Sequence, residues 1–221
     1  MKMRLLRFAR NDHCSSLSIT SQGLILILLF FLLFTSSTIA ETLDFLNSYS
    51  QNITPQVLII YDSVYGSTEL IAKWIAEGIK DNVIVKNINI TKESDLRDAH
   101  FILLGSPIYE ADVTEGMRDF IIKNSPYYKD KPFGLFVVCG THYVHGQRWV
   151  DNFEKLIGAK AKIKGYFGGI LKPEILNKED KKLLETYWRE RGISNIKEYN
   201  YLNKGKAVSF GKKIKELLSE L

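Results

Sequence analysis

From residue 57 onward, segments with the apolar pattern of a strand alternate with segments that have the apolar pattern of a helix. Residues 57–61 form a continuous apolar run, which is typical of a strand that is buried on both faces. A helical pattern over 67–80 follows this run directly. The same order of strand and helix recurs toward the end of the chain. It predicts an α/β fold with a parallel sheet and helices on both of its faces.

The later elements follow the same rhythm, with one interruption. Further strands are expected at 83–90, 101–104, 133–138 and 163–171, and further helices at 94–99, 114–123, 147–157 and 206–218. Short connections and right-handed crossovers leave the doubly wound orders as candidates for this five-stranded sheet. Residues 172–203 break the rhythm as an insert before the last helix, and they contain an extra predicted helix over 178–191. The apolar side of that helix carries Leu183, Leu184, Tyr187 and Trp188.

The first forty residues have the pattern of a targeting segment. Basic residues precede an apolar run over 24–34, and the small residues Thr38 and Ala40 suit signal-peptidase cleavage. The run is shorter than the ~20 residues that span a bilayer. We therefore expect a signal peptide over 1–40, a linker over 41–55 and an exported, periplasmic domain over 56–221. An uncleaved anchor would also leave the domain outside the cytoplasm, whereas a misassigned start codon would make it cytoplasmic.

Composition narrows the class of protein further. A chain of 221 residues with 45% hydrophobic residues can form one α/β domain with its own core. Most of the net charge of +5 comes from basic residues in the predicted signal, so the remainder does not indicate a nucleic-acid partner. Cys14 also lies there, which leaves Cys139 as a single thiol that we interpret as a small buried hydrophobic residue. No Cys/His grouping has the spacing of a metal site.

A hydroxyl-rich loop follows the first predicted strand and leads directly into a helix. Ser63, Ser67 and Thr68 offer hydroxyl donors, and Gly66 permits a tight turn. The N-terminus of the following helix presents unpaired N–H groups, which favour an anion. The loop has no lysine and lacks further glycines, so it is neither a P-loop nor a dinucleotide fingerprint. The sequence therefore predicts a phosphate cradle, or a simple helix-capping turn.

This loop carries a specific resemblance. The run Ile59-Ile60-Tyr61-x-Ser63-x-x-Gly66-x-Thr68-x-x-x-Ala72 resembles the FMN-phosphate signature of the flavodoxins. The resemblance implies a flavodoxin-like fold, with strand order 2-1-3-4-5, and FMN as its cofactor. It also implies a phosphate site that uses hydroxyls and backbone amides without a cation, formed by Ser63, Tyr65, Gly66, Ser67 and Thr68.

Two more loops are similar to the flavin-flanking loops of that family. The Ser-Pro-x-Tyr run after the third strand is similar to that of several FMN reductases, which implies contacts from Pro107, Ile108 and Tyr109, with Tyr109 stacked on the flavin ring. After the fourth strand the resemblance implies contacts from Gly140, Thr141, His142 and Tyr143. His142 and His145 are candidates for proton transfer, or are solvated loop residues.

Departures from the carrier flavodoxins bear on function. Those carriers are strongly acidic and often have a glycine after the third strand, whereas this domain is slightly basic and has Tyr109-Glu110-Ala111 there. Both departures favour an FMN oxidoreductase that transfers two electrons, linked to a quinone, to NAD(P)H or to another redox partner. The position of the insert is similar to that in menaquinone-dependent protoporphyrinogen oxidases.

Two other functions remain open, and so does the role of the insert. One alternative is a one-electron carrier flavodoxin, and the other is a flavodoxin fold without FMN that serves as a binding module. The apolar stripe of the insert helix either packs on the domain or faces a quinone or a membrane surface.

Overall fold

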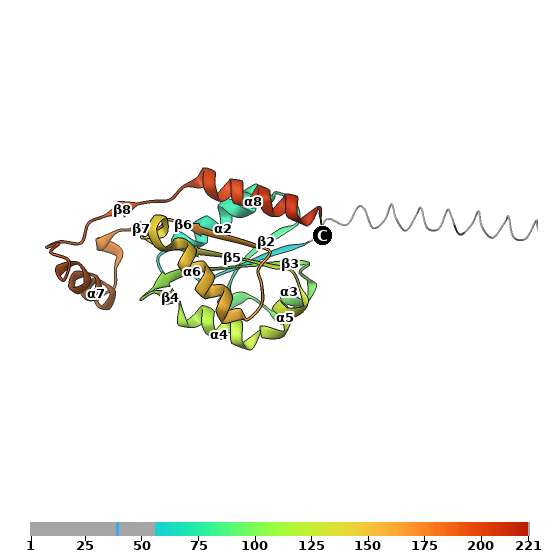
Figure 1. Ribbon diagram of the computed structural model, residues 1–221, viewed down its shortest axis with the longest axis horizontal. Coiled ribbons are helices and arrows are strands. Elements are labelled where there is room, and N and C mark those ends of the chain that lie inside the picture. Colours follow the sequence, from blue (N-terminus) through green and yellow to red (C-terminus); the bar gives the residue numbers. More distant parts are fainter. Residues whose placement is uncertain (1–38, 40–55, 221) are drawn as a thin grey trace, which may run out of the picture. The chain divides into compact units, whose positions relative to one another are not determined.

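The computed structural model describes residue 39 and residues 56–220 (Figure 1). The predicted linker over 41–55 lies outside the described residues, as does the predicted signal peptide or anchor apart from Ile39. Within the part of the chain that is described, no helix combines the length and the apolar character needed to cross a membrane.

A parallel sheet forms the centre of the domain. Its strands are β1 (Val57–Tyr61), β2 (Val83–Asn87), β3 (Phe101–Tyr109), β5 (Phe133–Val138) and β6 (Ile163–Phe167). They lie in the order β2-β1-β3-β5-β6, with every neighbouring pair parallel. The short β4 (Asp112–Val113) pairs antiparallel with the end of β3. The expected order 2-1-3-4-5 is therefore confirmed, because β4 only shifts the numbering.

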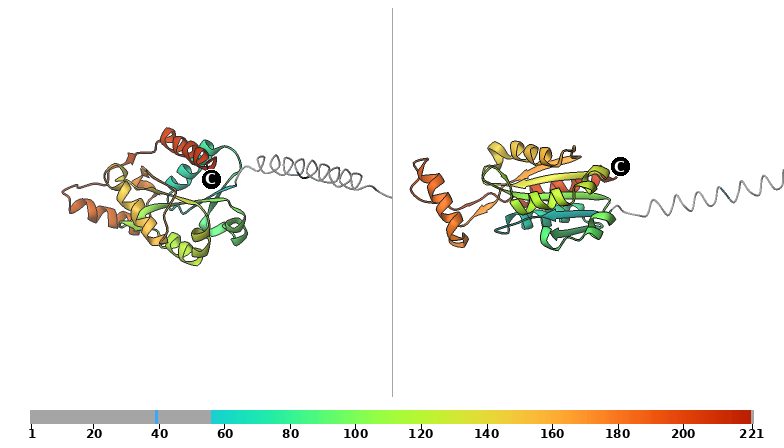
Figure 2. Two further views of the ribbon diagram at one scale, coloured as in Figure 1. Left: turned by 45° about the vertical axis from the view of Figure 1, so that its right-hand side comes forward. Right: turned by 90° about the horizontal axis from the view of Figure 1, so that it is seen from below.

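Helices cover both faces of this sheet (Figures 1 and 2). Alternating side chains of each strand pack on opposite faces; Leu58 and Ile60 of β1 belong to one core cluster, and Val57 and Ile59 to the other. One face is covered by α2 (Ser67–Ile79) and α8 (Lys204–Leu218). The opposite face is covered by α3 (Glu93–Asp98), α4 (Glu115–Lys123), α5 (Ser125–Asp130) and α6 (His142–Ile157).

Two glycines allow α2 and α8 to touch backbone to backbone. A Cβ atom on Gly78 would lie 2.1 Å from the Val208 carbonyl oxygen of α8. A Cβ atom on Gly211 would lie 2.1 Å from the Ile75 carbonyl oxygen of α2. Neither backbone atom can move without shifting a whole helix, so this crossing requires glycine on both sides.

Several boundaries differ from the expected ones for identifiable reasons. Helix α6 begins at His142 and not at 147, although Gly146 lowers the helix propensity of this segment. Glycine is needed there because a Cβ atom would lie 2.4 Å from the Tyr166 ring. Helix α5 was not expected; Pro126 lies in its first turn, where proline is well tolerated. The strand expected over 163–171 is broken, since β6 ends at Phe167. Short 3₁₀ turns occur at Ile88–Ile90 and Pro173–Ile175.

The two ends of the insert are joined by a short antiparallel strand pair. Strand β7 (Ile170–Leu171) pairs antiparallel with β8 (Tyr199–Asn200), and helix α7 (Lys178–Arg189) lies between them in the sequence. In every view α7 stands away from the sheet, beyond the end where β7 and β8 lie (Figures 1 and 2). None of its residues is buried. The apolar stripe of α7 therefore does not pack into the core of the domain.

Candidate functional site

A cleft of about 940 Å³ lies at the carboxyl ends of β1, β3 and β5. This is the edge of a doubly wound sheet at which ligands bind, and the volume is within the range of small-molecule sites. The three loops singled out in the sequence meet in it. The predicted residues that line the cleft are Ser63, Tyr65, Ser67, Thr68, Pro107, Ile108, Tyr109, Gly140, Thr141 and Tyr143. Gly66 and His142 are the predicted residues that are not part of its lining.

The loop between β1 and α2 has the geometry of an anion site. Gly66 has φ 86° directly before α2, and nothing lies within 4 Å of the position of an added Cβ atom. Gly66 has no side chain that could cap α2, and Ser63 Oγ accepts only the N–H group of Glu69 in the first turn of the helix. The N–H groups of Ser67 and Thr68, at the positive end of the helix dipole, therefore point out of the helix without a side-chain acceptor among the described residues.

The three hydroxyl groups of this loop all retain a proton to donate. Ser63 Oγ accepts hydrogen bonds from the N–H groups of Gly66 and Glu69, at 3.1 and 3.4 Å. Ser67 Oγ accepts one from the Ile170 N–H at 3.0 Å. Thr68 is 1% exposed, and its Oγ1 has no hydrogen-bond partner among the described residues. A buried hydroxyl without a partner is costly, so these residues fit a group that accepts hydrogen bonds, such as a phosphate.

The second loop is a tight hairpin that presents Tyr109. Strand β3 continues to Tyr109 and turns through Glu110 and Ala111 into β4, so that Tyr109 pairs with Asp112. Both turn residues have positive φ, 47° and 70°, the conformation of a two-residue hairpin loop without the usual glycine. Burial raises the pKa of Tyr109 far above its usual range, and the carboxylate of Asp180 adds to this shift. Tyr109 therefore offers a neutral ring to the cleft.

The third loop is short because α6 starts almost at once after β5. Tyr143 lies in the first turn of α6, lines the cleft and is 70% exposed. His142 packs outside the cleft against Tyr201, with ring centroids 5.8 Å apart. Burial, followed by the charge of Lys206, lowers the pKa of His142. His142 is therefore mostly neutral near pH 7 and is not placed to exchange protons with a ligand in the cleft.

Another wall of the cleft comes from the insert, whose apolar stripe was expected either to pack on the domain or to face a quinone or a membrane surface. Helix α7 contributes an apolar group of Leu183, Leu184, Tyr187 and Trp188, and β8 contributes Tyr199. The cleft also reaches Cys139, whose thiol pKa is raised by burial. The Tyr199-x-Tyr201 alternation was a sequence signal for a strand, but nothing in it indicated which strand it would pair with.

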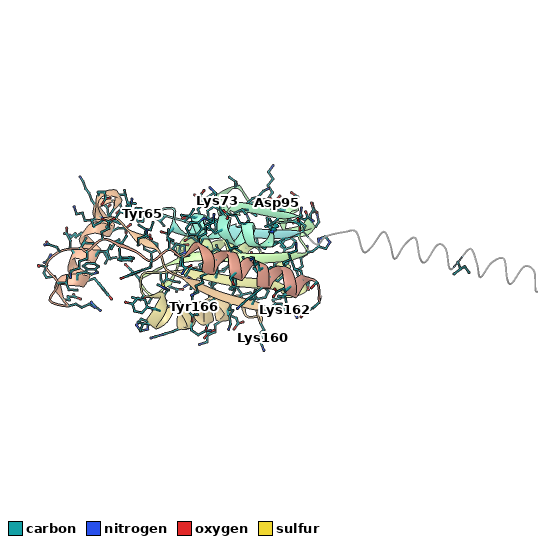
Figure 3. The ribbon with its side chains drawn as sticks, turned by 90° about the horizontal axis from the view of Figure 1, so that it is seen from above. Tyr65, Lys73, Asp95, Lys160, Lys162 and Tyr166 are labelled. Carbon is teal, nitrogen blue, oxygen red and sulfur yellow. The ribbon has the colours of Figure 1, made fainter. Side chains whose placement is uncertain are left out.

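The insert is attached to the phosphate loop through Tyr65. Figure 3 shows Tyr65 at the end of the sheet that faces α7. Its hydroxyl donates a hydrogen bond to the Asp180 carboxylate at the start of α7, and it accepts one from the Asn177 N–H at 3.2 Å. Asn177 also caps α7, with its side chain accepting from the Asp180 N–H at 2.7 Å. The start of α7 is thus fixed against the loop that forms the cradle.

Residues 58–195 match the family model of the flavodoxin domain. The chain belongs to the flavodoxin domain family. This membership confirms FMN as the cofactor, and the cradle described above fits its phosphate. The contacts of individual residues with FMN remain predictions.

A curated relative agrees with this assignment over part of its length. A flavodoxin from Clostridium saccharobutylicum is 31% identical over 83 residues. The match covers 36% of this chain and 52% of that protein, so the chain spans about half the length of the curated relative.

Solved structures show the same fold at low sequence identity. An archaeal flavodoxin matches with a TM-score of 0.50 and 16% identity, over 74% of this chain and 99% of that one. The two-electron reduced flavodoxin of Megasphaera elsdenii matches with 0.50 and 18%, over 73% and 99%. The Flv1 flavodiiron core of Synechocystis matches with 0.51 and 15%, over 77% of this chain but 37% of that one.

Proposed function

We propose that this FMN-binding electron-transfer flavodoxin domain passes two electrons between its flavin and a small apolar acceptor of the quinone class. FMN supplies the redox chemistry when it is bound. The residues of this chain hold FMN, shape the path to the acceptor and limit access by larger partners. A one-electron carrier that docks a redox protein is the competing function.

The observation that carries this proposal is the position of the apolar side of α7. Leu183 and Tyr187 are 47% and 44% exposed, yet they line the same cleft as the three flavin loops. An exposed apolar surface beside a cofactor cleft favours the binding of a flat apolar molecule. The slightly basic domain and the hairpin without glycine after β3 also support an enzyme over an acidic carrier.

Each loop has a proposed task toward FMN. The hydroxyls of Ser67 and Thr68 and the N-terminus of α2 hold the phosphate, because an anion is favoured there. The ring of Tyr109 packs on the flavin, since an aromatic face supplies apolar area at low entropic cost. The backbone of residues 140–143 faces the polar edge of the ring system.

The phosphate assignment is tested by comparing FMN with riboflavin, which lacks the phosphate. Thr68→Val keeps the side-chain shape but removes the hydroxyl, and we expect it to weaken FMN by roughly tenfold or more, the range for a hydrogen bond to a charged group. Riboflavin affinity should not change. Thr68→Asp adds a carboxylate at the dianion and should abolish FMN binding. Unchanged FMN affinity in both variants would show that the cradle is assigned wrongly.

The acceptor is tested by the reoxidation rate of reduced protein, followed by flavin absorbance in stopped flow. A short-chain quinone should reoxidise the protein faster than a one-electron protein acceptor at equal driving force. Leu183→Ser combined with Tyr187→Ser should slow the quinone reaction several-fold. Glu185→Ala on the same helix, which does not line the cleft, is the matched control. A potentiometric titration should give one two-electron wave; two well-separated one-electron waves would favour the carrier instead.

A further inference from the structure

The insert reaches the flavin loops through its own strand. Leu171 of β7 pairs with Tyr199 of β8, and Tyr201 N–H donates to the Gly169 carbonyl at 3.0 Å. Within β7, the Ile170 N–H donates to Ser67 Oγ of the phosphate loop. Strand β8 is therefore held at a defined position beside the cradle, although it follows β1 by more than a hundred residues.

The side chain of Tyr199 lies directly on Gly140, in the loop after β5. A Cβ atom on Gly140 would lie 2.2 Å from the Tyr199 hydroxyl oxygen and 2.8 Å from its Cζ atom. Any other residue at 140 would displace the tyrosine. Tyr199 lines the cleft that Tyr109 also lines, and burial raises its pKa to about 12, so its hydroxyl stays neutral.

One face of the Tyr199 ring is covered by another tyrosine. Tyr201 stacks on it with ring centroids 4.7 Å apart and an interplanar angle of 16°. Tyr201 in turn contacts the rings of His142 and Tyr143 at the start of α6. Tyr201 therefore fixes the plane of Tyr199 against the flavin loops, and both tyrosines line the cleft.

We propose that Tyr199, a residue of the insert, packs against the isoalloxazine ring of FMN together with Tyr109, and that Tyr201 is the positioning residue that orients it. Family resemblance had assigned this place to the loop after β5, through Tyr143 or His142. The structure puts His142 outside the cleft. Tyr143 lines the cleft but is 70% exposed, whereas Tyr199 is held between Tyr201 and Gly140. The inference depends on FMN as the cofactor and is independent of the electron acceptor.

The test measures the dissociation constants of FMN and riboflavin, by quenching of flavin fluorescence, on apoprotein prepared from the full-length chain. Tyr199→Ala should weaken both flavins by the same factor, roughly tenfold, which corresponds to a lost aromatic contact with part of its buried area. Tyr199→Phe should bind both as wild type does, because the ring and not the hydroxyl makes the contact. Tyr127→Ala, a tyrosine outside the cleft, is the matched control.

Four results would overturn the proposal. Unchanged flavin affinity in Tyr199→Ala would show that Tyr199 does not contact the flavin. A loss of flavin affinity in Tyr143→Ala alone would show that Tyr143 makes this contact instead. A loss for FMN but not for riboflavin would show that Tyr199 acts through Ser67 on the phosphate.

Tyr199→Leu keeps the bulk of the side chain if the alanine variant fails to fold. Flavin bound to it should emit more strongly than flavin bound to the wild type, and equal quenching would also contradict the proposal.

Discussion

Helices α8 and α7 have similar amphipathic patterns, but they serve different ends. The apolar residues Ala207, Phe210 and Ile214 of α8 are buried between that helix and the sheet. Those of α7 remain accessible and line the cofactor cleft. An apolar stripe therefore predicts a surface that needs a partner, and only the tertiary structure shows whether that partner is the core or a ligand.

The largest change in the free energy of unfolding is expected where α8 packs on α2. Gly211→Val places side-chain atoms into the Ile75 carbonyl, so we expect it to destabilise the fold by about 3 kcal/mol or more. Gly205→Ala lies in the same helix, where the nearest atom to an added Cβ is 3.5 Å away. It should stabilise the fold by about 0.5–1 kcal/mol, because alanine favours a helix more than glycine does. Urea unfolding of both variants tests this; similar midpoints would refute the close crossing.

A pair of truncations compares the two stripes directly. Ile214→Ala in α8 should cost about 2–5 kcal/mol, the range for a fully buried aliphatic side chain. Leu183→Ala in α7 should change the unfolding free energy by less than about 0.5 kcal/mol without a ligand. Thermal and chemical unfolding would measure both. A cost for Leu183→Ala close to that of Ile214→Ala would mean that α7 packs as part of the core.

The smallest of these three expected changes in stability concerns the ion pairs between β6 and α6. Lys164 of β6 contacts Asp151 and Glu154 of α6 at 2.7 and 2.9 Å, and hydrogen bonds from its ammonium group lower the pKa of both carboxyls. Their contribution is present above the unfolded values of 3.8 and 4.5, and it is lost as pH falls through the lower folded values.

Lys164→Met should therefore reduce stability near pH 7 by about 1 kcal/mol or less, because the three groups are partly solvated. The difference from wild type should vanish toward pH 2 in a series of melting temperatures. A difference that stays constant with pH would mean that Lys164 stabilises the fold through its aliphatic stem only.

Much of the fold followed from the sequence because its signals are local. The buried run over Val57–Tyr61, the hydroxyl loop and the helix after it predicted β1, the cradle and α2 with nearly the observed bounds. General rules of connection predicted a doubly wound sheet, and the resemblance to the flavodoxins implied its strand order. These signals also brought the three flavin loops to one edge, and the structure shows them around a single cleft.

The parts that were not predicted depend on contacts between distant residues. Strand β7 was taken as the end of β6, because only its pairing with β8 reveals the break at Gly168 and Gly169. His142 was placed at the flavin, but the ring of Tyr201 holds it outside the cleft. The role of Tyr199 depends on its contact with Gly140, which no periodicity of either segment records.

Hydrogen–deuterium exchange of the full-length protein with and without FMN tests most directly whether the insert belongs to the cofactor site. FMN should slow exchange in peptides that cover residues 63–70, 107–113 and 139–145, and also in the peptide that covers 197–202. The end of α8, over 212–218, should exchange at the same rate in both states. Protection of the three loops without protection of 197–202 would contradict the account, because the insert would then be attached to the domain without taking part in holding its cofactor.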